Sequence, residues 1–281
     1  MPWPRSARTR WAFKPLCMAE LSDNQNLERG IVVRDLRLAF GDTLVQEALS
    51  FAIHPASIFV IMGVSGCGKS TLLRHMIDLA RADQGEIVFD GKRLVTGDRA
   101  ERAALQRRIG VLFQSTALWS SMTVGENVAL PMQLHTKMGA GEIADQVAFK
   151  LALVGLAGQQ SRMPSELSGG MQKRAGLARA IALDPDYLFL DEPSAGLDPI
   201  TSQRLDALIM RLRDALKLSV IAVTHELPSI FTIADDSIYL DNHSKTAIAH
   251  GDPHRLVEQG PDRVRAFLKR EPIEAEETES I

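Results

Sequence analysis

The sequence predicts an α/β protein whose mostly parallel sheet is flanked by helices and interrupted by one helical insertion. From residue 31 onward, short β-branched runs alternate with longer helical stretches, which is typical of a parallel sheet covered by helices. Several of these runs are apolar at consecutive positions, as strands buried on both faces are. Between residues 113 and 187 helical periodicity replaces the strand pattern. We therefore expect an inserted helical subdomain there.

The expected strands follow in order along the chain, at residues 31–33, 58–62, 87–89, 109–113, 187–190, 220–224 and 237–240. A helix is predicted over 71–81, directly after the second strand. Within the insertion, Ile143, Val147, Leu151 and Val154 recur at helical spacing and predict an amphipathic helix. The acidic end at 271–281 is expected to be a solvated tail.

The amino-acid composition excludes several classes of function. The chain has 281 residues, is 45% hydrophobic and carries a formal net charge of −3, so it can bury a large core but has no basic domain for nucleic acid. Its two cysteines, Cys17 and Cys67, fit neither a disulfide framework nor a metal site and favour a reducing compartment. The most apolar stretches, 58–64 and 220–223, are far shorter than the roughly 20 residues of a membrane-spanning helix.

A phosphate-binding loop is predicted at 63–70, where the sequence reads Gly-Val-Ser-Gly-Cys-Gly-Lys-Ser between a buried strand and a helix. Glycines let the backbone wrap phosphates, and bare N–H groups at a helix N-terminus favour anions. We assign Lys69 to the β- and γ-phosphates and Ser70 to magnesium, with no role for the Cys67 side chain. The nucleotide-binding residues are then Gly63, Ser65, Gly66, Cys67, Gly68, Lys69, Ser70 and Thr71. A ligand-free glycine turn is the alternative.

Two acids follow the buried run at 188–190, where open parallel sheets bind ligands. Adjacent strand residues point in opposite directions, so one acid can reach magnesium while the next faces the attacking water. We assign Asp191 to magnesium and Glu192 to general base catalysis, a role worth about 10² to 10⁴ in rate. The alternative is that these acids only begin a turn before Pro193.

A second anion site is predicted at 167–171, Leu-Ser-Gly-Gly-Met, where Ser168 is the expected N-cap of a long helix and two glycines expose backbone donors. With this motif the sequence resembles the ATP-binding-cassette (ABC) ATPases over about residues 31–251. The resemblance implies a P-loop NTPase core of RecA-like type, with an antiparallel β part at its N-terminal end and an inserted helical subdomain.

The resemblance also implies further site residues. Phe40 stands where the family stacks an aromatic residue, usually Tyr, on adenine, although Phe40 lacks the usual hydroxyl and burial in the core also explains a Phe well. Gln114 falls at the Q-loop and is assigned to magnesium and catalysis. Residues 194–198 fall at the D-loop, which ends at Asp198, and His225 falls at the switch histidine. Catalysis is thus assigned to Lys69, Gln114, Glu192 and His225.

A homodimer is implied as well, because in this family two chains enclose two ATP molecules head to tail. Ser168, Gly169, Gly170 and Asp198 are assigned to the nucleotide, with Ser168 and Gly170 acting in trans.

Within the family, the insertion resembles that of the MlaF-type ATPases, which energise phospholipid movement with MCE-domain transporters. The resembling positions are 112–115, 117–118, 123–124, 126–129, 131, 135–136 and 163–166, followed by 198–201 and 263–268. Trp119 stands in place of a more usual Phe, and the acidic tail does not match the longer C-terminal extension of these proteins.

This likeness implies an ATP- and Mg²⁺-dependent ATPase that drives phospholipid transport for outer-membrane lipid asymmetry. Its implied place is peripheral, at the cytoplasmic face of the inner membrane. The implied partners are a second copy, a membrane permease (MlaE-like), an MCE-domain subunit (MlaD-like) and a STAS-domain subunit (MlaB-like).

We expect three regions: a disordered lead at 1–28, in which Met18 is an alternative start, an ABC ATPase domain at 29–252 with its helical subdomain at about 115–183, and a C-terminal helix with the acidic tail at 253–281. Other functions remain open. They are the ATPase of another ABC importer or exporter, a soluble ABC ATPase of repair or translation, a nucleotide-gated scaffold, and a P-loop kinase or GTPase. Glu192 and His225 argue against the scaffold, and residues 168–170 against the kinase or GTPase.

Overall fold

Two sheets organise the chain. The computed structural model describes residues 29–41, 43–95 and 98–272, so the expected lead with Met18 and the tail from residue 273 lie outside the described residues. The first sheet has the order β2-β1-β4-β5 and is antiparallel. Its strands are β1 (Ile31–Phe40), β2 (Thr43–Ile53), β4 (Gln84–Phe89) and β5 (Lys92–Arg93).

The second sheet has the order β10-β9-β3-β8-β7-β6. All its neighbouring strands run parallel except β10, which pairs antiparallel with β9. The strands are β3 (Ile58–Met62), β6 (Ile109–Leu112), β7 (Tyr187–Asp191), β8 (Ser219–Val223), β9 (Asp236–Leu240) and β10 (Ala247–Gly251). The predicted class, a mostly parallel core with an antiparallel part near the N-terminal end, is confirmed.

The strand prediction is incomplete in the antiparallel parts. It misses β2, β5 and β10, and it includes only the first three residues of β1 and the last three of β4. Register shifts interrupt the pairing of β1 with β2, and such bulges break the alternation from which a half-buried strand is predicted. β10 reads Ala-Ile-Ala-His-Gly, which has a single β-branched residue.

The helix predicted over 71–81 is wrong in its bounds, because α2 spans Lys69–Met76. Asp78 adopts a left-handed φ of 62° and turns the chain. Its buried carboxylate accepts hydrogen bonds from Arg102 and, at 3.0 Å, from Gln106, both on α3 (Arg99–Arg107). Contacts with a distant helix therefore end α2, and periodicity cannot reveal such contacts.

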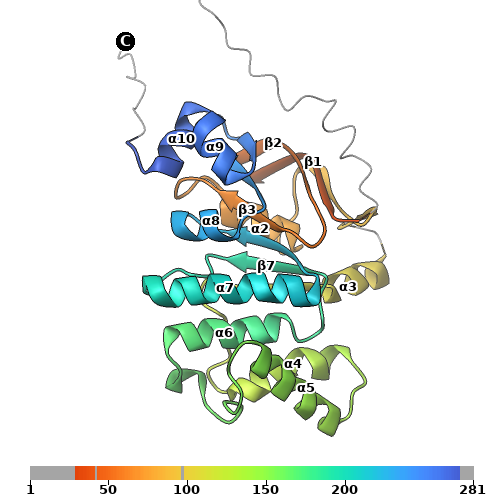
Figure 1. The fold of residues 1–281 in the computed structure, drawn as a ribbon. Helices are drawn as coiled ribbons and strands as arrows, with labels where there is room; N and C mark the ends of the chain where they lie inside the picture. Colours follow the sequence, from red (N-terminus) through yellow and green to blue (C-terminus); the bar gives the residue numbers. More distant parts are fainter. Residues whose placement is uncertain (1–28, 42, 96–97, 273–281) are drawn as a thin grey trace, which may run out of the picture.

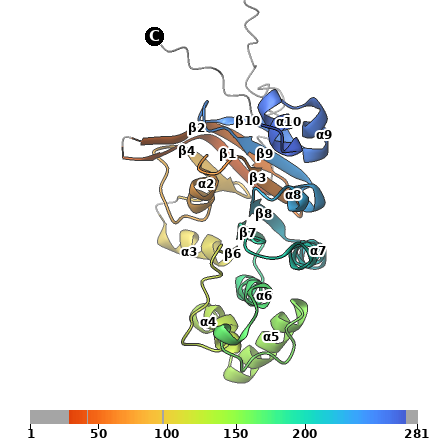
Figure 2. The same ribbon diagram turned by 90° about the vertical axis from the view of Figure 1, so that its left-hand side faces the viewer.

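Between β6 and β7 the described chain is helical, as predicted. It contains α4 (Val124–His135), α5 (Ala140–Leu153), the 3₁₀ turn η1 (Pro164–Glu166) and α6 (Gly169–Ala180). Helices α4 and α5 lie at one end of the molecule, and the antiparallel sheet lies at the other with the C-terminal helices (Figures 1 and 2). The later helices are α7 (Pro199–Leu216), α8 (Leu227–Ile233), α9 (Pro253–Gln259) and α10 (Asp262–Lys269). No helix in the described part is both long and apolar enough to cross a bilayer.

The core is divided by the six-stranded sheet. On β3, Ile58, Val60 and Met62 join the cluster that packs against the helices of the insertion and α7. The intervening Phe59 and Ile61 join a second cluster with α2 and the antiparallel sheet. Both clusters follow from the two-residue period of a strand. With both faces apolar, polar chemistry is confined to the strand ends.

Asp90 ties the two sheets together. Its Oδ1 accepts hydrogen bonds from the backbone N–H of Gly30 at 2.7 Å and from the hydroxyl of Tyr187 at 2.7 Å, while its Oδ2 is paired with Arg108 at 2.5 Å. Burial tends to raise the pKa of Asp90, but these hydrogen bonds outweigh it and hold the pKa below its ordinary value. The carboxylate is therefore a charged anchor between the sheets.

Candidate functional site

The loop at 63–68 joins β3 to α2 and requires its glycines. Gly63 has φ 147°, and a Cβ there would lie 2.5 Å from the main-chain oxygen of Leu240. Gly68, the N-cap residue of α2, has φ 103°, and a Cβ there would lie 2.7 Å from a methyl group of Val45. No larger residue fits either conformation. Both positions let the backbone approach closely, as a phosphate-binding loop requires.

Lys69 begins α2 and folds back over this loop. Its buried ammonium donates to the carbonyls of Gly63 at 2.9 Å and Val64 at 3.1 Å. The first turn of α2 contains no acidic residue, so the positive end of the helix and the ammonium act together on any anion placed above the loop.

Ser70 and Asp191 meet across the sheet. The Ser70 hydroxyl donates to Asp191 Oδ1 at 3.0 Å, which joins the start of α2 to the end of β7. Two hard oxygens at this spacing fit magnesium, which binds few protein ligands and keeps water or phosphate oxygens as the rest. Among the described residues, no group of three or more His, Cys, Asp or Glu side chains could hold a metal ion.

Glu192 follows β7 in a strained conformation, with a left-handed φ of 47°. Its Oε1 lies 2.8 Å from Nδ1 of His225, which follows β8 and has 54% of its side chain exposed. Its Oε2 is buried and has no partner. A buried carboxylate oxygen without a donor is the kind of exception that marks a place for water or ligand.

Gln46 lies on β2 and supports the loop, a role that the sequence pattern did not predict. The side chain is completely buried, and Nε2 donates to the carbonyls of Cys67 at 2.6 Å and Asp241 at 3.0 Å. Cys67 itself is buried, and burial raises the pKa of its thiol despite the nearby charge of Lys69. A buried thiol with a raised pKa is less reactive than an exposed one.

Lys173 was missed as well. It lies on α6, is 5% exposed, and donates to the carbonyls of Gln114 at 2.7 Å and Glu192 at 3.2 Å. Burial lowers the pKa of Lys173, although the charges of Asp191 and Glu192 act in the opposite direction. One sequence signal was available, because Lys173 stands one turn before Leu177 on the buried face of α6. The side chain of Gln114 is exposed.

The glycine motif at 168–170 begins α6. Ser168 is its N-cap, as predicted, and accepts from the backbone N–H of Met171 at 3.3 Å. Asp198 caps the neighbouring helix α7 by accepting from Ile200 and Thr201. The two helix starts are in contact, since a Cβ on Gly170 would lie 2.5 Å from Cγ2 of Thr201.

The predicted residues therefore fall into two groups. The first group lies at the carboxyl ends of the adjacent strands β3, β8 and β7 and contains Lys69, Ser70, Asp191, Glu192 and His225. The first group also includes the other predicted residues of the loop and the start of α2, which are Gly63, Ser65, Gly66, Cys67, Gly68 and Thr71. The second group lies at the starts of α6 and α7 and consists of Ser168, Gly169, Gly170 and Asp198. Phe40 ends β1 opposite Thr43, but its side chain lies outside the described part.

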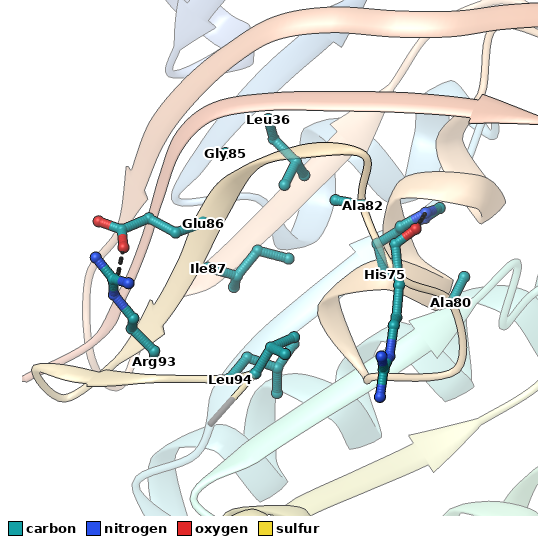
Figure 3. Close-up of a pocket in the computed structure, with 11 residues that line it drawn as sticks. Leu36, His75, Ala80, Ala82, Gly85, Glu86, Ile87, Arg93 and Leu94 are labelled. Atoms are coloured by element: carbon teal, nitrogen blue, oxygen red, sulfur yellow. Dashed lines mark hydrogen bonds and ion pairs between the residues drawn. The ribbon is translucent and has the colours of Figure 1, made fainter. Parts of the chain in front are cut away.

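A cavity of about 270 Å³ lies away from both groups, between α2 and the strands β4 and β5. In Figure 3, Leu36, Ile87 and Leu94 line its apolar side, and Glu86 and Arg93 form an ion pair at one edge. None of the predicted site residues lines it. The cavity is distinct from the candidate site.

Comparison with known proteins agrees with this geometry. The model of the ABC transporter family matches residues 46–195. The chain is 41% identical to the intermembrane phospholipid transport system ATP-binding protein MlaF of Escherichia coli K12, over 87% of this chain and 90% of that protein. It is 38% identical to the "Probable ribonucleotide transport ATP-binding protein mkl" of Mycobacterium tuberculosis, over 85% of this chain and 66% of that protein.

Solved structures are similar throughout most of the chain. CbiO1 of Clostridium perfringens, part of the ABC transporter complex CbiONQ, superposes with a TM-score of 0.75 at 26% identity, over 83% of this chain and 92% of that one. The dimeric bacterial ABC transporter cassette MJ0796 superposes with a TM-score of 0.71 at 26% identity, over 79% of this chain and 98% of that one.

Proposed function

This chain belongs to the ABC transporter family of ATP-binding proteins, and from that premise we propose that it powers the transport of phospholipid between membranes. Proteins of this family hydrolyse ATP, couple hydrolysis to transport, dimerise and pair with permease subunits. One observation carries the lipid assignment, namely the 41% identity to MlaF along 90% of that protein. The match to mkl, a protein named for ribonucleotide transport, covers only 66% of it.

The loop and α2 hold the nucleotide in this proposal. The backbone N–H groups around 63–71 cradle the phosphates, and the ammonium of Lys69 leaves the carbonyls of Gly63 and Val64 for the β- and γ-phosphates. Ser70, Asp191 and Gln114 would hold Mg²⁺, which would neutralise charge on the transferred phosphoryl group. Phe40 is assigned to the adenine.

Glu192 and His225 perform the proton chemistry. With Oε1 engaged by His225, the unpartnered Oε2 of Glu192 accepts a hydrogen bond from the attacking water and takes its proton. His225 holds the carboxylate in one orientation and is itself exposed on the nucleotide side of the strand ends. The pair therefore orients the nucleophile before hydrolysis.

The second group of residues acts across a dimer. Ser168, Gly169, Gly170 and Asp198 lie at two adjoining helix starts, and in the proposal they bind the nucleotide of the partner subunit. Shifting an open to closed ratio from 99:1 to 1:99 requires about 5.5 kcal/mol. Each of two ATP molecules then contributes about 2.7 kcal/mol by contacting this group only in the closed state.

We assign the complex to the cytoplasmic face of the inner membrane, with this chain as a peripheral subunit. The further partners are a MlaE-like permease, a MlaD-like MCE-domain subunit and a MlaB-like STAS-domain subunit. Support comes from the resemblance to MlaF. Affinity purification from native membranes, followed by identification of proteins and lipids, tests this. Recovery of a permease with an MCE-domain protein and phospholipid is expected, and recovery of a nucleoside-binding permease instead would contradict it.

The catalytic assignment is tested separately with Glu192→Gln. The amide cannot accept the proton, so we expect steady phosphate release to fall by at least about 100-fold while the Kd for ATP stays within about twofold, because Glu192 is not part of the phosphate cradle. Parental turnover in this variant would overturn the assignment of the base.

A further inference from the structure

Lys173 occupies a position that neither the glycine motif nor the carboxylates account for. It stands on α6, one turn beyond Gly169, with 5% of its surface exposed. Its ammonium donates to the main-chain carbonyls of Gln114, which follows β6, and of Glu192, which follows β7. One side chain therefore joins α6 to the backbone of two separate loops at the site.

Burying an ammonium without a good partner is unfavourable. A buried ammonium is ordinarily paired with a carboxylate. Lys150 on α5 is an example, since it is 1% exposed and forms an ion pair with Asp184. The two hydrogen bonds of Lys173 instead go to neutral carbonyls, and its ammonium forms no ion pair with Asp191 or Glu192, although the charges of these two acids act on it. The function of such bonds is to fix backbone, and the backbone of Glu192 has a left-handed φ that its surroundings must hold.

We propose that Lys173 is a positioning residue for ATP hydrolysis, which locks the turn at Glu192 and the loop at Gln114 to the start of α6. Because Lys173 lies on α6, whose N-cap is Ser168, displacement of this helix then moves the backbone that carries the base. Through Lys173, the state of the helical insertion is transmitted to Glu192. The inference rests on the proposed role of Glu192 as the base.

The test compares Lys173→Met with Lys173→Arg in the full chain. Methionine is unbranched and only one atom shorter than lysine, and it removes both hydrogen bonds. We therefore expect kcat to fall by about 10- to 100-fold, the loss expected from a misplacement of about 1 Å. The Kd for ATP should stay within about twofold, because the loop at 63–70 is untouched. Arginine keeps donors and charge, and should restore kcat to within about threefold of the parent.

Lys150→Met is the matched control, since it removes a buried ammonium of the same insertion that contacts no predicted site residue. With rates normalised to the ATP-binding stoichiometry, its kcat should equal that of the parent. Should Lys173→Met fail to fold, Lys173→Gln serves, because its shorter amide cannot reach both carbonyls and should lower kcat at least threefold.

Three results would overturn the proposal: parental kcat in both Lys173→Met and Lys173→Gln, an equal normalised loss in Lys150→Met, or a parallel weakening of ATP binding. Failure of the base assignment is distinguishable, since it is read from Glu192→Gln alone. In the Glu192→Gln background, Lys173→Met should cause no further loss in single-turnover rate, because both changes act through one group. An additive loss would show that Lys173 acts elsewhere.

Discussion

Gln46→Met perturbs the phosphate loop without touching the nucleotide. Gln46 is completely buried, and its amide donates to the carbonyl of Cys67 at 2.6 Å and to that of Asp241 at 3.0 Å. The first carbonyl lies in the loop and the second follows β9. Methionine has a similar length and no donor, so the substitution removes both hydrogen bonds and little volume.

The magnitude follows from three buried polar atoms. Each carbonyl left without its donor costs about 1–3 kcal/mol, or about 2–6 kcal/mol for the pair. Gln46 Oε1 is itself buried without a partner, so its removal returns about 1–3 kcal/mol. The net destabilisation is therefore about 1–3 kcal/mol. Because only the Cys67 carbonyl belongs to the loop, about 1–2 kcal/mol of this falls on nucleotide binding, which corresponds to a Kd weaker by about 5- to 30-fold.

Two measurements check this, namely the urea midpoint followed by circular dichroism and the Kd for ATP of the isolated subunit. Gln172→Met is the matched control, because Gln172 also donates to two carbonyls, those of Pro164 and Leu167, but on the side of α6. It should lower the midpoint and leave the Kd unchanged. If Gln46→Met retains both the midpoint and the Kd of the parent, or if Gln172→Met weakens ATP binding as much, the reasoning is wrong.

Two further predictions concern the scaffold. Gly110→Ala places a Cβ 2.2 Å from the main-chain oxygen of Ala180, and this overpacking should destabilise the fold by at least about 1–3 kcal/mol. Gly141→Ala, by contrast, adds its Cβ in open space within α5 and should stabilise the fold by about 0.5–1 kcal/mol. Urea midpoints of the two variants in the opposite order would refute this prediction. Asp90→Asn should cost about 1–3 kcal/mol near neutral pH. Because folding lowers the pKa of Asp90 from its ordinary 3.8, its contribution is present above pH 3.8 and is lost as pH falls through the folded pKa. The gap between parent and variant in chemical unfolding should close below that pH, and a constant gap would contradict the assignment.

What the sequence predicted well was local in the chain. The loop at 63–70 and the acids Asp191 and Glu192 stand directly after apolar runs that form strands β3 and β7. Parallel strands bring such ends to one edge of the sheet, so the pairing of Ser70 with Asp191 follows from the topology. Helix periodicity likewise identified α5, because Ile143, Val147 and Leu151 are buried on one face.

The groups that the sequence did not reveal act across long separations. Gln46 contacts carbonyls 21 and 195 residues away, and Lys173 contacts one 59 residues away. The acceptors in these contacts are main-chain oxygens. Because every residue has one, the residue types in the sequence do not predict which residues form these hydrogen bonds. The premature end of α2 has the same origin, since Asp78 is held by side chains from α3.

Buried polar atoms without a hydrogen-bond partner indicate where the fold gives up stability for function. In the part of the chain that the structure describes, six buried side-chain oxygens lack a partner. Three of them border the candidate site, on Gln46, Glu192 and Ser194. A buried oxygen without a hydrogen-bond donor lowers the stability of the fold by about 1–3 kcal/mol. Such an oxygen is explained when it accepts a hydrogen bond from a bound ligand or water. The Glu192 oxygen has the clearest use, because its neighbour oxygen is held by His225 and its backbone by Lys173. A carboxylate that is fixed on two sides and unsatisfied on the third is poised to accept one proton at one place, which is the requirement for a general base.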